Sequence, residues 1–160
     1  MLRVVVDTNK VIASLLRDGK VRRLLFHLGL EILLPKYVLE EINKHREYLE
    51  RKVPPKAIDF IISKISKKAK IIGARELDRK VLNKARRLVE AFDIDDHPFI
   101  AVAIECNAII WTNDKELIKH VLISGEYLAT DTQALERLLK GEELTKVLQA
   151  LKEKYLTGKQ

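Results

Sequence analysis

RVVVDTN, residues 3–9, is a run of β-branched side chains that ends at once in three polar residues. A run of this kind predicts a strand buried on both faces of a parallel sheet, followed by a turn. Residues 31–34 (EILL), 70–72 (KII) and 108–111 (AIIW) repeat the pattern, and residues 126–130 (EYLAT) form a shorter candidate. The sequence therefore predicts four to five strands.

Helical periodicity fills the intervals between these strands, because apolar residues there recur every three or four positions. Strands that alternate with helices predict a three-layer α/β fold, in which a central parallel sheet carries helices on both faces. We expect a single domain over residues 1–156 and a frayed tail at residues 157–160. The expected helices cover residues 11–16, 21–28, 36–49, 54–65, 78–92, 99–106, a segment that begins near 115, 132–140 and 142–155.

The composition is that of a globular chain with a basic surface. Its 160 residues are 47% apolar and carry a formal charge of +7. This size supplies a core without disulfide bonds, which the single Cys106 could not form within the chain. Cys106 lies in an apolar run, so we expect a buried, inert thiol. The positive charge favours polyanionic partners but identifies none by itself.

No segment of the sequence has the length of a secretion signal or a membrane span. The apolar start at residues 2–6 is too short for a signal peptide, and no later run approaches a transmembrane length. We therefore expect a cytoplasmic protein without a membrane partner.

Acidic residues gather where the predicted strands and helices end. Asp7 follows the first strand directly, and Asp114 follows the strand at 108–111 after two residues. If these two parallel strands are neighbours, both carboxylates lie at the sheet edge where such folds bind ligands. Asp93, Asp95 and Asp96 precede the buried helix at 99–106, and three acids are more than a helix N-cap needs.

A set of carboxylates at one edge implies a cation, although any one of them alone is also explained by turn chemistry. Oxygen ligands suit Mg²⁺ or Mn²⁺ rather than zinc. Zinc would need His or Cys ligands, and the histidines, at 27, 45, 97 and 120, are scattered without ligand spacing. Of these, only His97 adjoins the acids.

A magnesium or manganese site on a basic protein favours phosphodiester hydrolysis. The chain has no Gly-rich phosphate-binding loop, which excludes P-loop nucleotide hydrolysis. The helix at 78–92 carries one strongly basic face, which is either a solvated exterior or a phosphate-binding surface. Its residues are Arg79, Lys80, Lys84, Arg86 and Arg87.

Four segments taken in order, VVVDTNKVIASLL, LPKYVLEEI, DIDDHPFIAVAIE and IIWTNDKEL, resemble the PIN-domain nucleases. Within that family the chain is most similar to the prokaryotic, VapC-like group that supplies the toxins of toxin–antitoxin pairs. The resemblance covers about residues 2–130 and rests on the order and spacing of the segments rather than on any single motif.

The resemblance implies roles for particular residues. It implies four catalytic acids: Asp7, Glu41, Asp96 and Asp114. All of these except Glu41 would also hold the metal. Glu116 stands where many members have an Asp, and the roles of Asp93 and Asp95 stay open. Neighbouring polar residues would orient water or a phosphate of the substrate: Thr8, Asn9, Thr112 and Asn113.

Helical phase offers an independent argument for Glu41. On a helix over residues 36–49, Val38, Ile42, His45 and Leu49 form one buried stripe. Glu41 then lies at the boundary of the core, whereas Glu40 points into solvent.

The resemblance implies an endoribonuclease that uses Mg²⁺ or Mn²⁺ and cleaves RNA, commonly as a homodimer and, in toxins, blocked by a small antitoxin. Two alternatives stay open: an RNA-processing PIN nuclease without an antitoxin, and a non-catalytic RNA-binding domain of the same fold. The helix at 142–155 would either pack on its own domain or pair across a dimer.

Two other folds with clustered acids are excluded. A phosphoacceptor receiver domain needs an acceptor Asp after a middle strand, and Gly73 and Ala74 follow the strand at 70–72. A haloacid-dehalogenase-type phosphatase needs a second Asp two residues after Asp7, where Asn9 stands.

Overall fold

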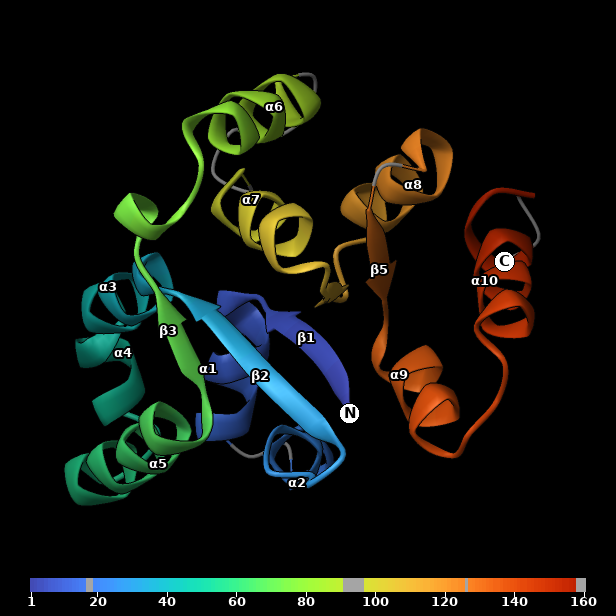
Figure 1. The fold of residues 1–160 in the computed structure, drawn as a ribbon. Helices are drawn as coiled ribbons and strands as arrows, with labels where there is room; N and C mark the ends of the chain where they lie inside the picture. The colour runs from blue at the N-terminus through green and yellow to red at the C-terminus, as the bar shows by residue number, and fades with distance from the viewer. Residues whose placement is uncertain (17–18, 91–96, 126, 158–160) are drawn as a thin grey trace.

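The computed structural model describes residues 1–16, 19–90, 97–125 and 127–157. Within them, a five-stranded parallel sheet has the strand order β3-β2-β1-β4-β5 (Figure 1). This confirms the predicted α/β fold with a central parallel sheet. The strands are β1 (Leu2–Val6), β2 (Leu30–Pro35), β3 (Lys70–Ile72), β4 (Ile109–Trp111) and β5 (Leu128–Thr130).

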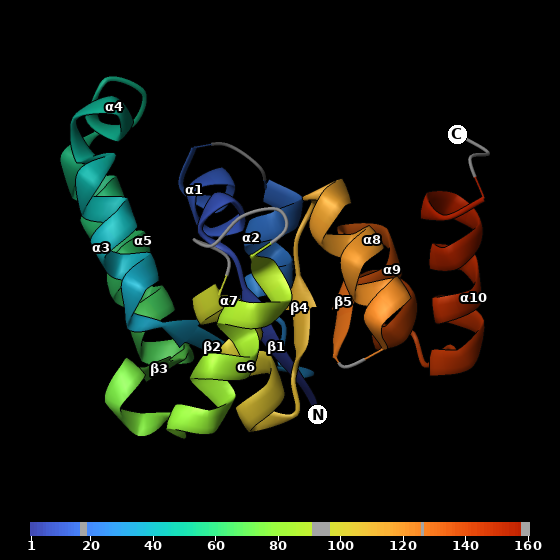
Figure 2. The same ribbon diagram turned by 90° about the horizontal axis from the view of Figure 1, so that it is seen from above.

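Helices cover both faces of the sheet. α7 contacts β1, β2 and β4 and lies above the sheet in Figure 1, whereas α1 and α2 lie below it. Figure 2 shows α3, α4 and α5 beside β3 at one end and α8, α9 and α10 beside β5 at the other. The helices are α1 (Thr8–Leu16), α2 (Gly19–Leu25), α3 (Lys36–Lys44), α4 (Arg46–Glu50), α5 (Pro55–Lys68), α6 (Arg79–Val89), α7 (His97–Cys106), α8 (Lys115–Ser124), α9 (Thr132–Leu139) and α10 (Leu144–Tyr155), with a short 3-10 helix at Ala74–Glu76.

The core lies between the sheet and these helices. Val4, Val5 and Val6 of β1 are each 0% exposed, which explains why these three positions are all apolar rather than alternating. Burial of one such side chain stabilises the fold by about 1.5–3 kcal/mol. Cys106 is half-buried, and burial is the main cause that raises the pKa of its thiol.

The prediction of one helix over residues 36–49 is wrong. α3 ends at Lys44 and α4 begins at Arg46, and His45 between them is exposed. The apolar members of the predicted stripe, Val38, Ile42 and Leu49, are buried. At His45 the backbone leaves helical geometry, with φ −94° and ψ 6°, although its N–H still donates to the Glu41 carbonyl at 3.2 Å, so the helix is interrupted at a single residue.

α10 packs on its own domain, where it contacts α8 and α9. Val147 and Leu151 form a second, small core with Ala134 of α9. This favours the first of the two interpretations of the C-terminal helix. Every helix in the described ranges is too short or too polar to cross a bilayer.

The predicted site requires the strands before Asp7 and Asp114 to be neighbours, and the strand order shows that they are. β1 and β4 are adjacent and parallel, and Val6 pairs with Trp111 at their carboxyl ends. The segments that begin at Asp7 and Thr112 therefore leave the sheet side by side, at the edge where parallel sheets bind ligands.

Candidate active site

Asp7 ends β1 and caps α1. Its backbone N–H donates to the Trp111 carbonyl at 3.4 Å, which continues the pairing of β1 with β4. Its Oδ1 atom accepts the Lys10 N–H at 2.9 Å, as an N-cap side chain does. The Asp7 carboxylate is therefore held beside the end of the neighbouring strand.

Thr112 links the two strand ends through one hydroxyl group. Its side chain is fully buried, and its Oγ1 atom donates to Asp7 Oδ2 at 2.5 Å. The same oxygen accepts the Asp114 N–H at 3.0 Å. Asp114 in turn caps α8, because its Oδ1 accepts the backbone N–H groups of Glu116 and Leu117. Thr112 thus fixes both acids relative to each other.

A cavity of about 350 Å³ opens between the two strand ends. Asn9 and Asn113 are exposed and border it beside the two acids. Thr8 is not part of this lining, and its buried Oγ1 has no hydrogen-bond partner within the described ranges. The full lining is Asp7, Asn9, Lys10, Ala13, Asn113 and Asp114.

Burial is the largest influence on the pKa of the Asp7 carboxyl and raises it above its ordinary value. The hydrogen bonds from Thr112 and from the Lys10 backbone, together with the Lys10 ammonium, lower the pKa, whereas the charge of Asp114 raises it further. A cation bound beside both carboxylates would favour their ionised forms and so remove this cost.

Lys10 lines this cavity and Thr132 holds it there, and neither residue was predicted from the sequence. Lys10 is only 4% exposed; its Nζ donates to Thr132 Oγ1 at 3.0 Å and lies 5.8 Å from the centre of the Trp111 ring. Trp111 Nε1 donates to the same Thr132 oxygen at 3.1 Å. A signal was present, because Lys10 shares an inward helix face with Ser14, and lysines are rarely buried unless paired.

Glu41 lies on the core boundary of α3, as its helical phase predicts, and is half-buried. Its Oε1 atom lies 3.1 Å from Lys44 Nζ, and its side chain is also hydrogen-bonded to Tyr37. The hydrogen bond from Lys44 is the largest influence on the pKa of Glu41, which is lowered. Glu41 does not line the cavity between Asp7 and Asp114, so its catalytic role stays a prediction.

The remaining predicted acids either lie outside the described residues or lie away from this cavity. Asp93, Asp95 and Asp96 lie outside the described residues. Glu116 is exposed, and its Oε1 atom lies 3.7 Å from Lys119 Nζ. His97 is the first residue of α7 and lines a different cavity.

The donor groups at this edge fit a hard divalent cation. The cavity presents carboxylate and amide oxygens, which are the ligands that Mg²⁺ and Mn²⁺ prefer. The described ranges contain no group of three or more His, Cys, Asp or Glu side chains placed to hold a metal. Asp7 and Asp114 thus supply two carboxylates, and the third predicted ligand, Asp96, is the residue whose position is not described.

The predicted basic face lies on α6. Arg79, Lys80, Arg86 and Arg87 are exposed, whereas Lys84 is half-buried. Asp78 caps the helix by accepting the Lys80 N–H at 2.7 Å, and α6 packs on α7. The predicted helical pattern is therefore confirmed, with its cationic residues directed mainly to solvent.

Comparison with known proteins identifies the family and supports the fold. A family profile described as a PIN domain matches residues 5–152 of the chain. A chain in the crystal structure of VapBC2 from Rickettsia felis, bound to a DNA fragment from their promoter, is similar with a TM-score of 0.60 and 14% sequence identity. The similarity covers 81% of this chain and 98% of that chain, and at this identity it shows the fold alone. No curated protein sequence matches.

Proposed function

Because this chain belongs to the PIN-domain family, we propose that it is a metal-dependent endoribonuclease that hydrolyses phosphodiester bonds at the Asp7–Asp114 cavity. The observation that carries the proposal is the Thr112 hydroxyl, which donates to Asp7 and accepts the Asp114 N–H. It holds two carboxylates at one edge of the sheet although their charges repel each other, an arrangement that a bound cation stabilises.

Asp7, Asp114 and Asp96 would hold Mg²⁺ or Mn²⁺, which supplies Lewis-acid activation of a phosphoryl oxygen and of water. Asn9 and Asn113 border the cavity, and their amides would orient a phosphate or a water molecule. Lys10 keeps a fixed positive charge beside the acids, held by Thr132.

A toxin role in a toxin–antitoxin pair, with a small antitoxin as partner and a homodimer as assembly, is the finer part of the proposal. It rests on the VapC-like sequence segments and on a fold shared with a VapBC2 complex. The second candidate is an RNA-processing nuclease without an antitoxin. A small overlapping upstream gene that encodes a DNA-binding N-terminus would favour the toxin, and a solitary locus would favour RNA processing.

The metal site predicts a stabilisation that needs no substrate. A cation that binds only the folded state raises the melting temperature, and a concentration one hundred times the Kd contributes about 2.7 kcal/mol. We therefore expect millimolar Mn²⁺ at low ionic strength to raise the melting temperature and to permit cleavage of single-stranded RNA, whereas EDTA abolishes both effects. Calorimetry and a fluorescent RNA substrate measure the two; no shift and no cleavage would reject the proposal.

The basic face of α6 predicts a salt-dependent affinity for RNA. Each phosphate of a single-stranded RNA that the protein neutralises contributes about 0.7 to the slope of log K for binding against log salt concentration. Replacing Lys80, Lys84 and Arg87 together by Gln should flatten this slope by up to about 2. Filter binding at several salt concentrations measures it.

A matched control for this change exists on α5, where three exposed lysines can be replaced by Gln with the same loss of charge: Lys56, Lys64 and Lys67. We expect this variant to keep the slope of the natural chain. Equal flattening in both variants would mean that net charge, and not the α6 face, determines the affinity.

A further inference from the structure

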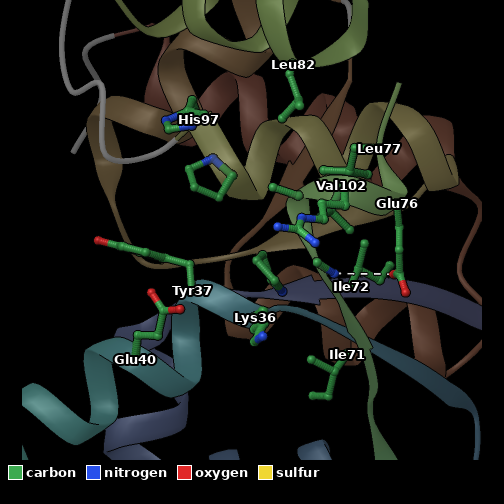
Figure 3. A pocket seen from close by; sticks show the side chains of 15 residues that line it. Lys36, Tyr37, Glu40, Ile71, Ile72, Glu76, Leu77, Leu82, His97 and Val102 are labelled. Atoms are coloured by element: carbon green, nitrogen blue, oxygen red, sulfur yellow. Dashed lines mark hydrogen bonds between the residues drawn. The ribbon is translucent and has the colours of Figure 1, made fainter. Parts of the chain in front are cut away.

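A second and larger cavity, of about 700 Å³, lies at the carboxyl ends of β2 and β3. α3 forms one side of it, and the segment after β3, together with α6 and α7, forms the other sides. Figure 3 shows Tyr37 and Glu40 on the α3 side, and Ile72, Glu76 and Val102 across the cavity from them. The volume lies within the range of pockets that bind small organic groups, about 300–1,000 Å³.

The register of the sheet places this cavity next to the Asp7 site. Val5 of β1 pairs with Leu33 of β2, so Pro35, two residues further on, lies level with Asp7. Pro35 and its partner Ile72 in β3 both line the larger cavity. Adjacent strands are about 4.8 Å apart, a step shorter than one nucleotide. The nucleotide next to a phosphate held at Asp7 is therefore within one step of Pro35, which lines this cavity.

Tyr37 gives the cavity an aromatic surface. Its ring packs edge-to-face on Phe99, with ring centres 6.2 Å apart and an interplanar angle of 77°. This packing and the hydrogen bond to Glu41 fix the ring, which is half-buried and remains part of the cavity lining. A fixed aromatic ring beside a single-stranded substrate is a stacking surface for a base.

Glu40 gives the cavity a hydrogen-bond acceptor. Its carboxylate is exposed, lines the cavity and has no hydrogen-bond or ion-pair partner in the described part of the chain. The other carboxylate of the lining, on Glu76, already accepts the Gly73 N–H at 3.3 Å. An ionised carboxylate presents two acceptors and no donor. Among the four RNA bases, guanine alone offers two adjacent N–H donors on its Watson–Crick edge, which match these two oxygens.

We propose that the cavity over β2 and β3 binds the base of the nucleotide next to the scissile phosphate, and that Glu40 selects guanine. Tyr37 stacks on the base, and the Glu40 carboxylate accepts its N1–H and N2–H. This assignment deepens the proposed ribonuclease function and rests on it.

Lys36 and Arg75 balance Glu40 and Glu76 in the lining, so it is the bordering basic helix α6 that favours RNA over a protein segment as the occupant. Lys36 and Arg75 are exposed cationic residues of the lining, suited to the phosphates on either side of the bound base. Leu82 of α6 also lines the cavity, so the basic helix borders it directly. A polyanion that crosses this edge meets cationic side chains next to the base-binding surface.

The test measures binding separately from cleavage. RNA hexamers of uridine, with or without one central guanosine, are titrated by fluorescence anisotropy in EDTA, so that no metal-dependent cleavage occurs. The natural chain should bind the guanosine hexamer roughly 5- to 100-fold more tightly, as expected for a bidentate base contact. Glu40→Gln should lose this preference, because an amide replaces one acceptor with a donor. Glu47→Gln, an exposed Glu on α4 outside the cavity, should keep it.

Tyr37 variants test the stacking contact. Tyr37→Leu should weaken binding of both hexamers by roughly 5- to 100-fold, since stacking does not depend on the base. Tyr37→Phe should restore it, and Tyr48→Leu, an exposed Tyr outside the cavity, should have no effect. Equal affinity for both hexamers, or RNA binding unchanged in Tyr37→Leu and Glu40→Gln, would overturn the inference and leave the cavity to a protein partner. The ribonuclease proposal is tested separately, by the cleavage assay in Mn²⁺, and absence of RNA cleavage there would contradict that proposal and not the binding result.

Discussion

Asp7→Asn should reduce RNA cleavage in Mn²⁺ by roughly 100- to 1,000-fold while the protein stays folded. The variant removes one of the two described carboxylates of the cavity and therefore weakens cation binding. Asn keeps an oxygen that accepts the Lys10 N–H, and Asn is as good an N-cap residue as Asp. Single-turnover cleavage measures the loss, and circular dichroism verifies the fold.

The same variant should change how stability depends on pH. Because burial raises the pKa of Asp7, ionisation of its carboxyl costs more in the folded protein than in the unfolded chain. In the metal-free protein, protonated Asp7 contributes fully to the free energy of unfolding below about pH 3.9. This contribution is lost as the pH rises through the raised pKa of the folded state. Because Asn does not ionise, the Asp7→Asn variant does not lose stability in this way as the pH rises. Its melting temperature relative to the natural chain should rise from pH 4 toward neutrality, and Mn²⁺ should no longer raise it.

Asp78→Asn is the matched control for Asp7→Asn. Asp78 caps α6 through the Lys80 N–H and is exposed, away from the Asp7 cavity. This control should cleave RNA and respond to Mn²⁺ as the natural chain does. Full cleavage by Asp7→Asn would show that the carboxylate pair is not the catalytic centre.

Glu41→Gln should slow RNA hydrolysis by about 100-fold if this acid provides a general-base or metal-orienting contact. The structure adds a condition, because Glu41 is held by Lys44 and Tyr37 rather than placed in the Asp7 cavity. The prediction therefore requires the Glu41 side chain to reach the substrate when RNA is bound. Single-turnover kinetics measure the effect, with Glu47→Gln on α4 as the control of equal charge.

The contrast between Glu41 and Glu40 decides which glutamate is the fourth acid. A large loss of rate in Glu40→Gln with none in Glu41→Gln would assign that role to Glu40 and reject the argument from helical phase. A loss of rate in Glu41→Gln, together with a loss of guanine preference in Glu40→Gln, would give the two neighbours separate roles.

The fold was predictable because most of its elements carry a strong local signal. β1 contains the apolar run Val4–Val6 and β2 the run Ile32–Leu34, and the burial of these side chains follows from a position inside a covered parallel sheet. The break at His45 was not predictable from periodicity, since Val38, Ile42 and Leu49 keep the same spacing with or without it. Periodicity reports which side chains are buried and does not report whether the backbone is continuous.

The site was predictable only where position along a strand determines position in space. Asp7 and Asp114 follow parallel strands, and the adjacency of β1 and β4 brings them together. Lys10 and Thr132 were missed because their contact joins α1 to α9, and no sequence pattern links these helices. The larger cavity was missed for the same reason, since it is formed by side chains from α3, β3, α6 and α7.

The hydrogen bond between Asp7 and Thr112 joins residues 105 positions apart, and the bond between Lys10 and Thr132 spans 122 positions. At about 5–20 residues per second, the ribosome adds Thr112 roughly 5 to 20 s after Asp7. While these intervening residues are synthesised, the nascent chain carries Asp7 without the strand that completes the carboxylate pair. Fragments from a broken messenger that end before β4 lack the pair altogether, so the proposed nuclease site can form only after β4 and Asp114 have been synthesised.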